Sequence, residues 1–173
     1  PYCPCPAGFD ELAAHLKWVE PGRIGIVPGL SCLHAGLPDS QHLRQIPDVM
    51  RGEEVQVFGA LQSLGLKDAL MVLPGTHSKW VQVRDSRIER FQTCMTGELF
   101  ALLRQHSILS RTLPALHGAA DSELDTTAFD EGVALALASP SLLTTAFSTR
   151  SLGLWKTLAP SALISHLTGL VIS

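Results

Sequence analysis

Apolar and polar residues alternate along two neighbouring stretches near the middle of the chain. Residues 79–84 and 88–93 change between apolar and polar at most steps, and Asp85-Ser86 lies between them. A period of two predicts strands with one buried face, and a short turn between two such strands predicts a β-hairpin. Apolar runs that stop at Pro-Gly pairs predict two further strands. The predicted strands are 23–27, 69–73, 79–84 and 88–93.

Apolar residues spaced three or four apart predict helices before, between and after the strands. Val55, Phe58, Leu61 and Leu64 predict the buried face of one helix that begins with two acids. Thr96 is the expected N-cap of another helix. The predicted helices cover 9–19, 53–64, 96–106 and 126–137, with two more opening at Ser139-Pro140 and at Pro160.

The later helices and the loops complete the predicted arrangement. Leu142, Leu143 and Phe147 predict the buried face of the helix after Pro140. The helix after Pro160 has an apolar face that needs a partner, and no residues follow it to supply one. Residues 31–47 and 111–123 are predicted to be loops. The fold class is therefore α/β, with a mixed sheet and flanking helices.

Composition narrows the class of protein. Of the 173 residues, 46% are hydrophobic and 17% are charged, which is typical of a folded globular chain. The net charge of −3 argues against nucleic acid or an anionic membrane as a partner. No apolar run is long enough to cross a bilayer. The four cysteines do not have zinc-ligand spacing, so we expect reduced thiols in a cytoplasmic protein and no metal ligand among them.

The turn between the second and third predicted strands is a candidate phosphate site. Gly75 allows a ligand to approach the backbone, and the N–H groups around Thr76 can converge on an anion. Ser78 adds a hydroxyl donor, and Lys79 adds a mobile positive charge. The competing interpretation is an ordinary turn between two core strands, because one Gly-Thr pair is a weak signal.

Two acids at the start of the second predicted helix are candidate catalytic residues. Glu53 and Glu54 directly follow Arg51-Gly52. The simple interpretation is that they complement the helix dipole, at about 0.3–1 kcal/mol each. That interpretation leaves the charge and the glycine before them unexplained. A carboxylate at such a position can take a proton from a substrate hydroxyl if a cleft desolvates it.

Three stretches taken together carry a family resemblance. They are Val27–Leu30, then Val49–Glu54 with Gly59-Ala60, and then Leu73–Val81 with Met95–Leu99. In combination they resemble the 2-dehydro-3-deoxygalactonokinase family, which belongs to the actin-like ATPase and sugar-kinase superfamily. Residues 129–150 and 167–172 also look like that family, so the resemblance covers nearly the whole chain.

The resemblance implies transfer of the ATP γ-phosphoryl group to the terminal hydroxyl of 2-dehydro-3-deoxy-D-galactonate, with Mg²⁺. It implies a partial ribonuclease-H-like fold of two lobes. Residues 1–50 would end the first lobe and connect the lobes, and residues 51–173 would form the core of the second. The implied partners are a sugar acid and a nucleotide, and homo-oligomer formation by the full-length enzyme stays open.

The resemblance also implies roles for individual residues. Related kinases carry a Gly-Asp pair where this chain has Gly52-Glu53, so Glu53 would be the base, with Glu54 as its rival. Gly75 and Thr76 would hold the transferring oxygens, with Ser78 beside them, and Lys79 would offset developing charge. A separate hypothesis, based on charge and on proximity in sequence rather than on the resemblance, is that Arg51 or His77 pairs with the substrate carboxylate. Thr96 and Glu98 complete the expected substrate-binding group, and no residue is assigned to metal.

The chain departs from the family at both ends. The first phosphate loop, an Asp-Trp-Gly-Thr-type stretch that supplies the magnesium-linked aspartate, is absent, and so is the glycine-rich adenosine-binding segment. We therefore expect a central part of a kinase with little activity alone. The alternative is a non-catalytic module that binds a sugar acid or a protein, and titration with the sugar acid and with ATP–Mg²⁺ would separate the two. A hydrolase using Ser78 and His77 is disfavoured, because adjacent residues on a strand point to opposite faces.

Overall fold

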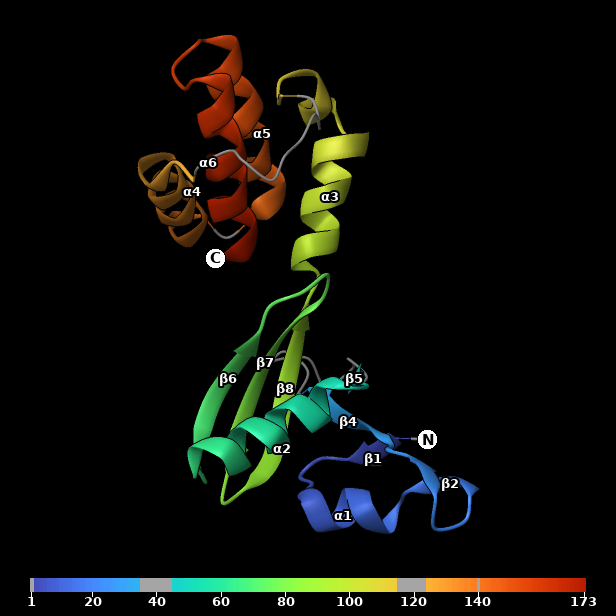
Figure 1. Cartoon of the computed structure of the whole chain (residues 1–173). Coiled ribbons are helices and arrows are strands. Elements are labelled where there is room, and N and C mark those ends of the chain that lie inside the picture. Colours follow the sequence, from blue (N-terminus) through green and yellow to red (C-terminus); the bar gives the residue numbers. More distant parts are fainter. Residues whose placement is uncertain (1, 35–44, 115–123, 140) are drawn as a thin grey trace. The chain divides into compact units, whose positions relative to one another are not determined.

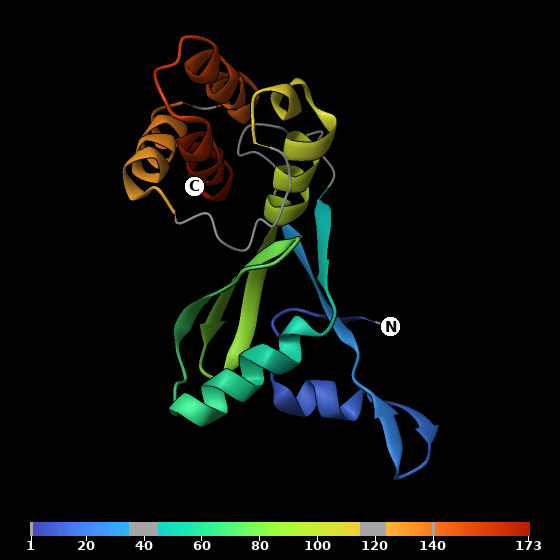
Figure 2. The ribbon, with the colours of Figure 1, turned by 45° about the horizontal axis from the view of Figure 1, so that its top comes forward.

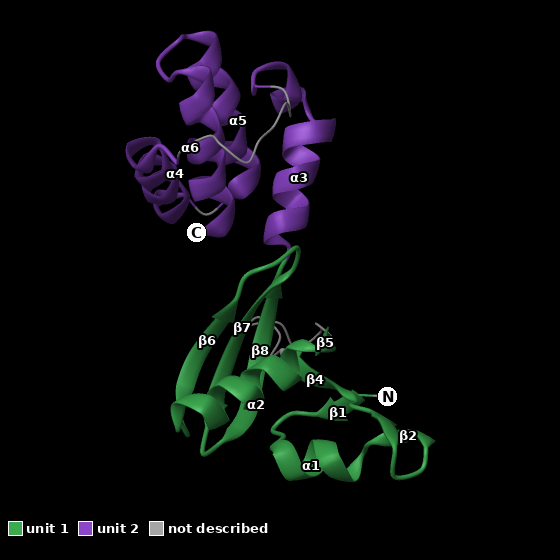
Figure 3. Cartoon of the chain, in the orientation of Figure 1, with its two compact units in different colours: residues 1–94 green, residues 95–173 purple. Residues whose placement is uncertain are grey.

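The chain forms two compact units, residues 1–94 and 95–173, which Figure 3 colours separately. The computed structural model describes residues 2–34, 45–114, 124–139 and 141–173. Each unit has a hydrophobic core of its own. The predicted mixture of sheets and flanking helices is confirmed (Figure 1). In the described ranges, all strands belong to the first unit and the second is helical.

The described residues of the first unit form three small sheets and two helices. The sheets have the strand orders β1-β4-β5, β2-β3 and β6-β7-β8. β1 is parallel to β4, and the other pairs are antiparallel. In chain order the elements are β1 Tyr2–Pro4, α1 Phe9–Ala14, β2 Lys17–Glu20, β3 Ile24–Ile26, β4 Gly29–His34, β5 Ile46–Met50, α2 Glu53–Leu64, β6 Ala69–Leu73, β7 Ser78–Arg84 and β8 Arg87–Cys94.

The core of this unit lies between the β6-β7-β8 sheet and α2. Both views of the ribbon show α2 crossing one face of that sheet (Figures 1 and 2). Val57 and Leu61 of α2 belong to the same buried cluster as Val81 of β7 and Phe91 of β8. Phe91 is 2% exposed, and burying a side chain of this size contributes roughly 1.5–3 kcal/mol.

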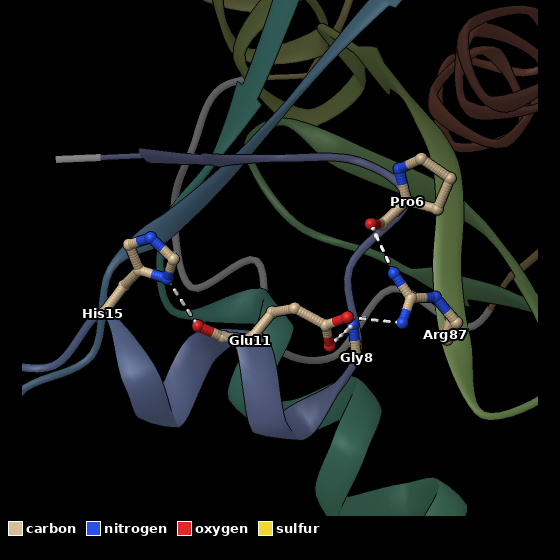
Figure 4. Close-up of polar contacts among 5 residues, drawn as sticks. All are labelled: Pro6, Gly8, Glu11, His15 and Arg87. Atoms are coloured by element: carbon tan, nitrogen blue, oxygen red, sulfur yellow. Dashed lines mark hydrogen bonds and ion pairs between the residues drawn. The ribbon is translucent and has the colours of Figure 1, made fainter.

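The N-terminal segment is tied to β8 by a polar cluster (Figure 4). The Arg87 guanidinium pairs with the Glu11 carboxylate and also donates to the Pro6 carbonyl at 2.9 Å. The other Glu11 oxygen accepts from the Gly8 N–H at 2.9 Å, so the same side chain satisfies the start of α1. Glu11 is thereby stabilised as a carboxylate, and the Arg87 hydrogen bond is the main cause of its lowered pKa.

The second unit is a set of helices around α6. Its elements are α3 Thr96–His106, a 3-10 turn Ile108–Arg111, α4 Thr126–Ala138, α5 Leu142–Leu154 and α6 Pro160–Ile172. Leu163 and Leu167 are at most 1% exposed and form the centre of its core. The apolar face of α6, predicted to need a partner, is therefore covered by elements that precede it in the chain.

Two glycines allow α4 and α6 to approach closely. A Cβ added at Gly132 would lie 2.2 Å from the carbonyl oxygen of His166, and one added at Gly169 would lie 2.2 Å from that of Phe129. Such distances leave no room for a methyl group. Beside this contact, the His166 ring is 2% exposed, and its Nδ1 lies 3.2 Å from the Thr149 hydroxyl of α5. Burial lowers the pKa of His166, so the core favours the neutral ring.

The structure corrects the predicted first helix and the loop at 31–47. The helix ends at Ala14 rather than at Val19, because residues 17–20 form β2 and pair with β3 around a turn at Gly22 (φ 72°). The predicted loop overlaps the end of β4 and the start of β5, which pair with each other. Residues 35–44, and residues 115–123 of the other predicted loop, lie outside the described residues. The four predicted strands are confirmed.

The predicted helix faces were also partly wrong. On α2, Leu61 is buried as predicted, but Val55 and Leu64 are exposed, and Glu54 is buried instead. On α5, Thr145 and Thr149 are buried, whereas Leu143 and Phe147, predicted to be buried, are exposed.

Two helix starts differ from prediction by one or two residues. Thr96 is the first helical residue of α3, preceded by Met95 at the N-cap. Ser139 ends α4 rather than capping α5, which begins after Ser141. The predicted helix start at Pro140 lies outside the described residues. Such shifts are within the ordinary uncertainty of helix ends.

The boundary between the two compact units lies between Cys94 and Met95, and not at residue 50. Met50 lies in the same core as Val57 and Leu61, so the residues before and after that point pack together. The assignment of residues 1–50 and 51–173 to two lobes stays a prediction. Among the described residues, no helix combines the length and apolar character needed to span a bilayer.

Candidate functional site

The turn between β5 and α2 carries the two candidate acids. Gly52 has φ 108°, a conformation that favours glycine, and it is the N-cap residue of α2. Both carboxylate oxygens of Glu54 accept from the Gly52 N–H, at 2.9 and 2.7 Å. Glu53 Oε2 accepts from the Arg51 N–H at 3.0 Å. The two side chains therefore fold back onto the turn and satisfy backbone donors that precede the helix.

The two acids have different surroundings. Glu54 is 1% exposed, and burial is the main cause of its raised pKa, with the neighbouring charge of Glu53 acting in the same direction. Glu53 is only partly buried. A proton acceptor must reach its substrate, so the geometry favours Glu53 as the acid that contacts a ligand and Glu54 as the acid that holds the turn.

The raised pKa of Glu54 predicts a pH-dependent effect on stability. Above the folded-state pKa of Glu54 the native chain buries a carboxylate that the unfolded chain leaves in water. The free energy of unfolding therefore falls as pH rises through this pKa. We expect Glu54→Gln, which keeps an acceptor for the Gly52 N–H, to raise the melting temperature at pH 7. The gain should shrink toward pH 4, where Glu54 is protonated. Thermal melts of both proteins at each pH measure this, and a lower melting temperature for the variant at pH 7 would contradict it.

The candidate phosphate turn is open to solvent. Leu73 pairs with Lys79, so these residues close the β6–β7 hairpin around the turn. Gly75 and Thr76 are exposed, and a Cβ added at Gly75 would meet nothing closer than the His77 carbonyl oxygen at 4.0 Å. The turn is therefore not packed against apolar neighbours, and its backbone is accessible to an anion.

Ser78 and Lys79 differ from the turn that precedes them. Both are buried, at 8% and 6% exposure. Lys79 Nζ donates to the Val49 carbonyl at 3.0 Å and to the Thr93 hydroxyl at 2.7 Å. Lys79 is therefore not the mobile surface charge that the sequence suggested, because its ammonium group is directed into the unit. Phosphate binding by these two residues stays a prediction.

The first unit contains eight of the ten predicted site residues. Arg51, near Glu53, has its guanidinium carbon 4.9 Å from the centre of the Tyr2 ring, a cation–π contact. His77 belongs to the exposed turn. Thr96 and Glu98 lie in the first turn of α3, in the second unit. Substrate binding by these four residues stays a prediction.

Sequence reasoning missed two polar residues beside the site. Asp48 of β5 accepts from the Thr93 N–H at 2.7 Å and from the Thr93 hydroxyl at 2.6 Å. No signal in the sequence indicated this contact, because a register shift in the hairpin decides which residue lies opposite Lys79. Metal binding has less support. Among the described residues, no group of three His, Cys, Asp or Glu side chains could hold a metal ion.

Known proteins are similar to this chain along its whole length. The family model for 2-keto-3-deoxy-galactonokinase matches residues 1–173. The 2-dehydro-3-deoxygalactonokinase of Escherichia coli is 38% identical over 172 residues, which cover 99% of this chain and 53% of that protein. A probable 2-dehydro-3-deoxygalactonokinase of Rhizobium meliloti is 40% identical over 150 residues, which cover 84% of this chain and 47% of that protein.

A solved structure of a similar protein also has a similar fold. The crystal structure of a candidate 2-dehydro-3-deoxygalactonokinase from Sinorhizobium meliloti matches with a TM-score of 0.80 at 37% identity. The match covers 99% of this chain and 54% of the other. The chain therefore spans about half the length of the relatives it matches.

Proposed function

The chain belongs to the 2-keto-3-deoxy-galactonokinase family, and we propose that it forms part of a sugar-acid kinase. The reaction is transfer of the ATP γ-phosphoryl group to the terminal hydroxyl of 2-dehydro-3-deoxy-D-galactonate. The observation that carries the proposal is the Gly52-Glu53 turn, in which a partly exposed carboxylate stands at the start of α2 beside a buried one. The finer fold assignment, a ribonuclease-H-like sugar kinase, is part of this proposal.

Phosphoryl transfer asks a protein mainly for positioning and for stabilisation of charge. Glu53 accepts the proton of the attacking hydroxyl and orients that oxygen toward phosphorus. The N–H groups of Gly75 and Thr76, on the exposed turn, donate to phosphoryl oxygens as negative charge develops. Arg51 or His77 pairs with the carboxylate of the sugar acid.

Family kinases use ATP together with Mg²⁺, which neutralises phosphate charge when bound. Among the described residues no group of three His, Cys, Asp or Glu side chains could hold a metal ion, and no step here is assigned to a metal ligand of this chain. The proposed contributions of this segment are the base and one phosphate-binding turn.

A direct assay tests the proposal. The intact protein is here the complete kinase of which this chain is proposed to form part. When purified, it should convert ATP and 2-dehydro-3-deoxy-D-galactonate to ADP and a phosphorylated sugar acid, which mass spectrometry identifies. The matched control is the analogue without the terminal hydroxyl, which should not react. The isolated 173-residue segment should show little turnover. Tight binding of the sugar acid by the intact protein, with no phosphorylation, would overturn the proposal and favour a binding module.

A further inference from the structure

Lys79, Thr93 and Asp48 form a connected set of hydrogen bonds across three strands. Lys79 of β7 donates to the Thr93 hydroxyl of β8 at 2.7 Å, and that hydroxyl donates to Asp48 Oδ1 of β5 at 2.6 Å. The Thr93 N–H donates to Asp48 Oδ2 at 2.7 Å. Lys79 also donates to the Val49 carbonyl at 3.0 Å. The Thr93 hydroxyl therefore lies at the centre of the set, where it accepts one hydrogen bond and donates another.

These bonds join two sheets that share no backbone ladder. β5 belongs to the β1-β4-β5 sheet, whereas β7 and β8 belong to the β6-β7-β8 sheet. Besides the shared apolar core, directional side-chain bonds therefore hold β5 against β7 and β8 at this point. A buried ammonium group is costly unless its donors are satisfied, and Lys79 at 6% exposure has two oxygen acceptors here.

The position of the set along the chain gives it a functional meaning. Lys79 is the second residue of β7, three residues after Thr76 of the exposed turn. Val49 is near the end of β5, four residues before Glu53. The set thus connects the strand that leaves the candidate phosphate turn to the strand that leads to the candidate base.

We propose that Lys79, Thr93 and Asp48 are positioning residues that fix the phosphate turn relative to Glu53. This inference rests on the proposed kinase function, and it assigns Lys79 a role other than binding phosphate. The network does not touch the reacting atoms. It acts through the ends of β5 and β7, where a displacement of about 1 Å can cost up to about 100-fold in rate.

The test uses a matched pair of substitutions at Thr93. Thr93→Val keeps the shape and removes the hydroxyl, whereas Thr93→Ser keeps the hydroxyl and removes a methyl group. In the intact protein we expect Thr93→Val to lower kcat about 10-fold or more, with the KM for ATP changed less than about twofold, and Thr93→Ser to stay near wild type. A folded Thr93→Val protein with wild-type kcat would overturn the proposal. So would a raised KM for ATP in Lys79→Met without loss of kcat, because that result indicates direct phosphate binding.

A second measurement does not depend on activity. In ¹H–¹⁵N spectra of the 173-residue chain, Thr93→Val should shift the amide signals of both Gly52-Glu53 and Gly75-Thr76. Shifts confined to residues that contact Thr93 would overturn the positioning role even if the kinase assignment stands. If Thr93→Val does not fold, Asp48→Asn replaces it, since asparagine keeps one acceptor oxygen and loses the other. The same two segments should then shift, and unchanged signals would again overturn the proposal.

Discussion

Glu53→Gln should lower the kcat of the intact protein by about 10²–10⁴-fold, the range for loss of a general base. Glutamine has nearly the shape of glutamate and can still accept from the Arg51 N–H, but it cannot take a proton from the sugar-acid hydroxyl. Binding of both substrates should change little. Steady-state kinetics with ATP and 2-dehydro-3-deoxy-D-galactonate measure the effect.

Glu54→Gln is the matched control for this experiment. Glu54 is 1% exposed and bonded to the Gly52 N–H, so its amide variant should keep most of the activity. The opposite result, an active Glu53→Gln protein and an inactive Glu54→Gln protein, would exchange the roles of the two acids. Wild-type kcat in both variants would remove the turn from the mechanism.

Gly132→Ala should destabilise the second unit by about 1–2 kcal/mol net. The added methyl group would lie 2.2 Å from the His166 carbonyl oxygen, and overpacking of a core typically costs about 1–3 kcal/mol. The contact is with backbone, so α4 and α6 would have to separate along their whole interface. The better helix propensity of alanine, about 1 kcal/mol, offsets only part of this cost.

Denaturant unfolding, followed by hydrogen exchange in peptides from α4 and α6, measures the change. The control is Gly59→Ala on α2, where an added Cβ meets nothing within 4 Å. That substitution should be neutral or stabilising by about 0.5–1 kcal/mol, because it gains helix propensity without a clash. Equal stability of the Gly132→Ala and wild-type proteins would show that the two helices do not pack as closely as described.

The sequence predicted the hairpin but could not predict its register. Counting back from the Asp85-Ser86 turn pairs Lys79 with Gln92. The register shifts between Gln82 and Val83, and this irregularity pairs Lys79 with Thr93 instead. A bulge inserts one residue into a strand without changing the apolar pattern enough to be recognised. The network around Thr93 was therefore hidden from the sequence.

The charged residues of the site were the hardest to place from sequence. A lysine after a Gly-Thr turn suggests a solvent-exposed cation, yet Lys79 is buried because oxygen acceptors on β5 and β8 satisfy it. Glu54 is buried on α2, contrary to the predicted helix face, for a similar reason: its carboxylate accepts a hydrogen bond from the Gly52 N–H. Apolar spacing determines a helix face only where polar side chains find no local partner.

The burial of Lys79 also makes it a natural reporter for chemical footprinting. The other lysines, Lys17, Lys67 and Lys156, are all exposed. Reagents that acylate amines should label those three rapidly and leave Lys79 unmodified while β5 stays in place. The rate at which Lys79 becomes labelled would then measure how often the first unit opens around this residue, without an engineered probe.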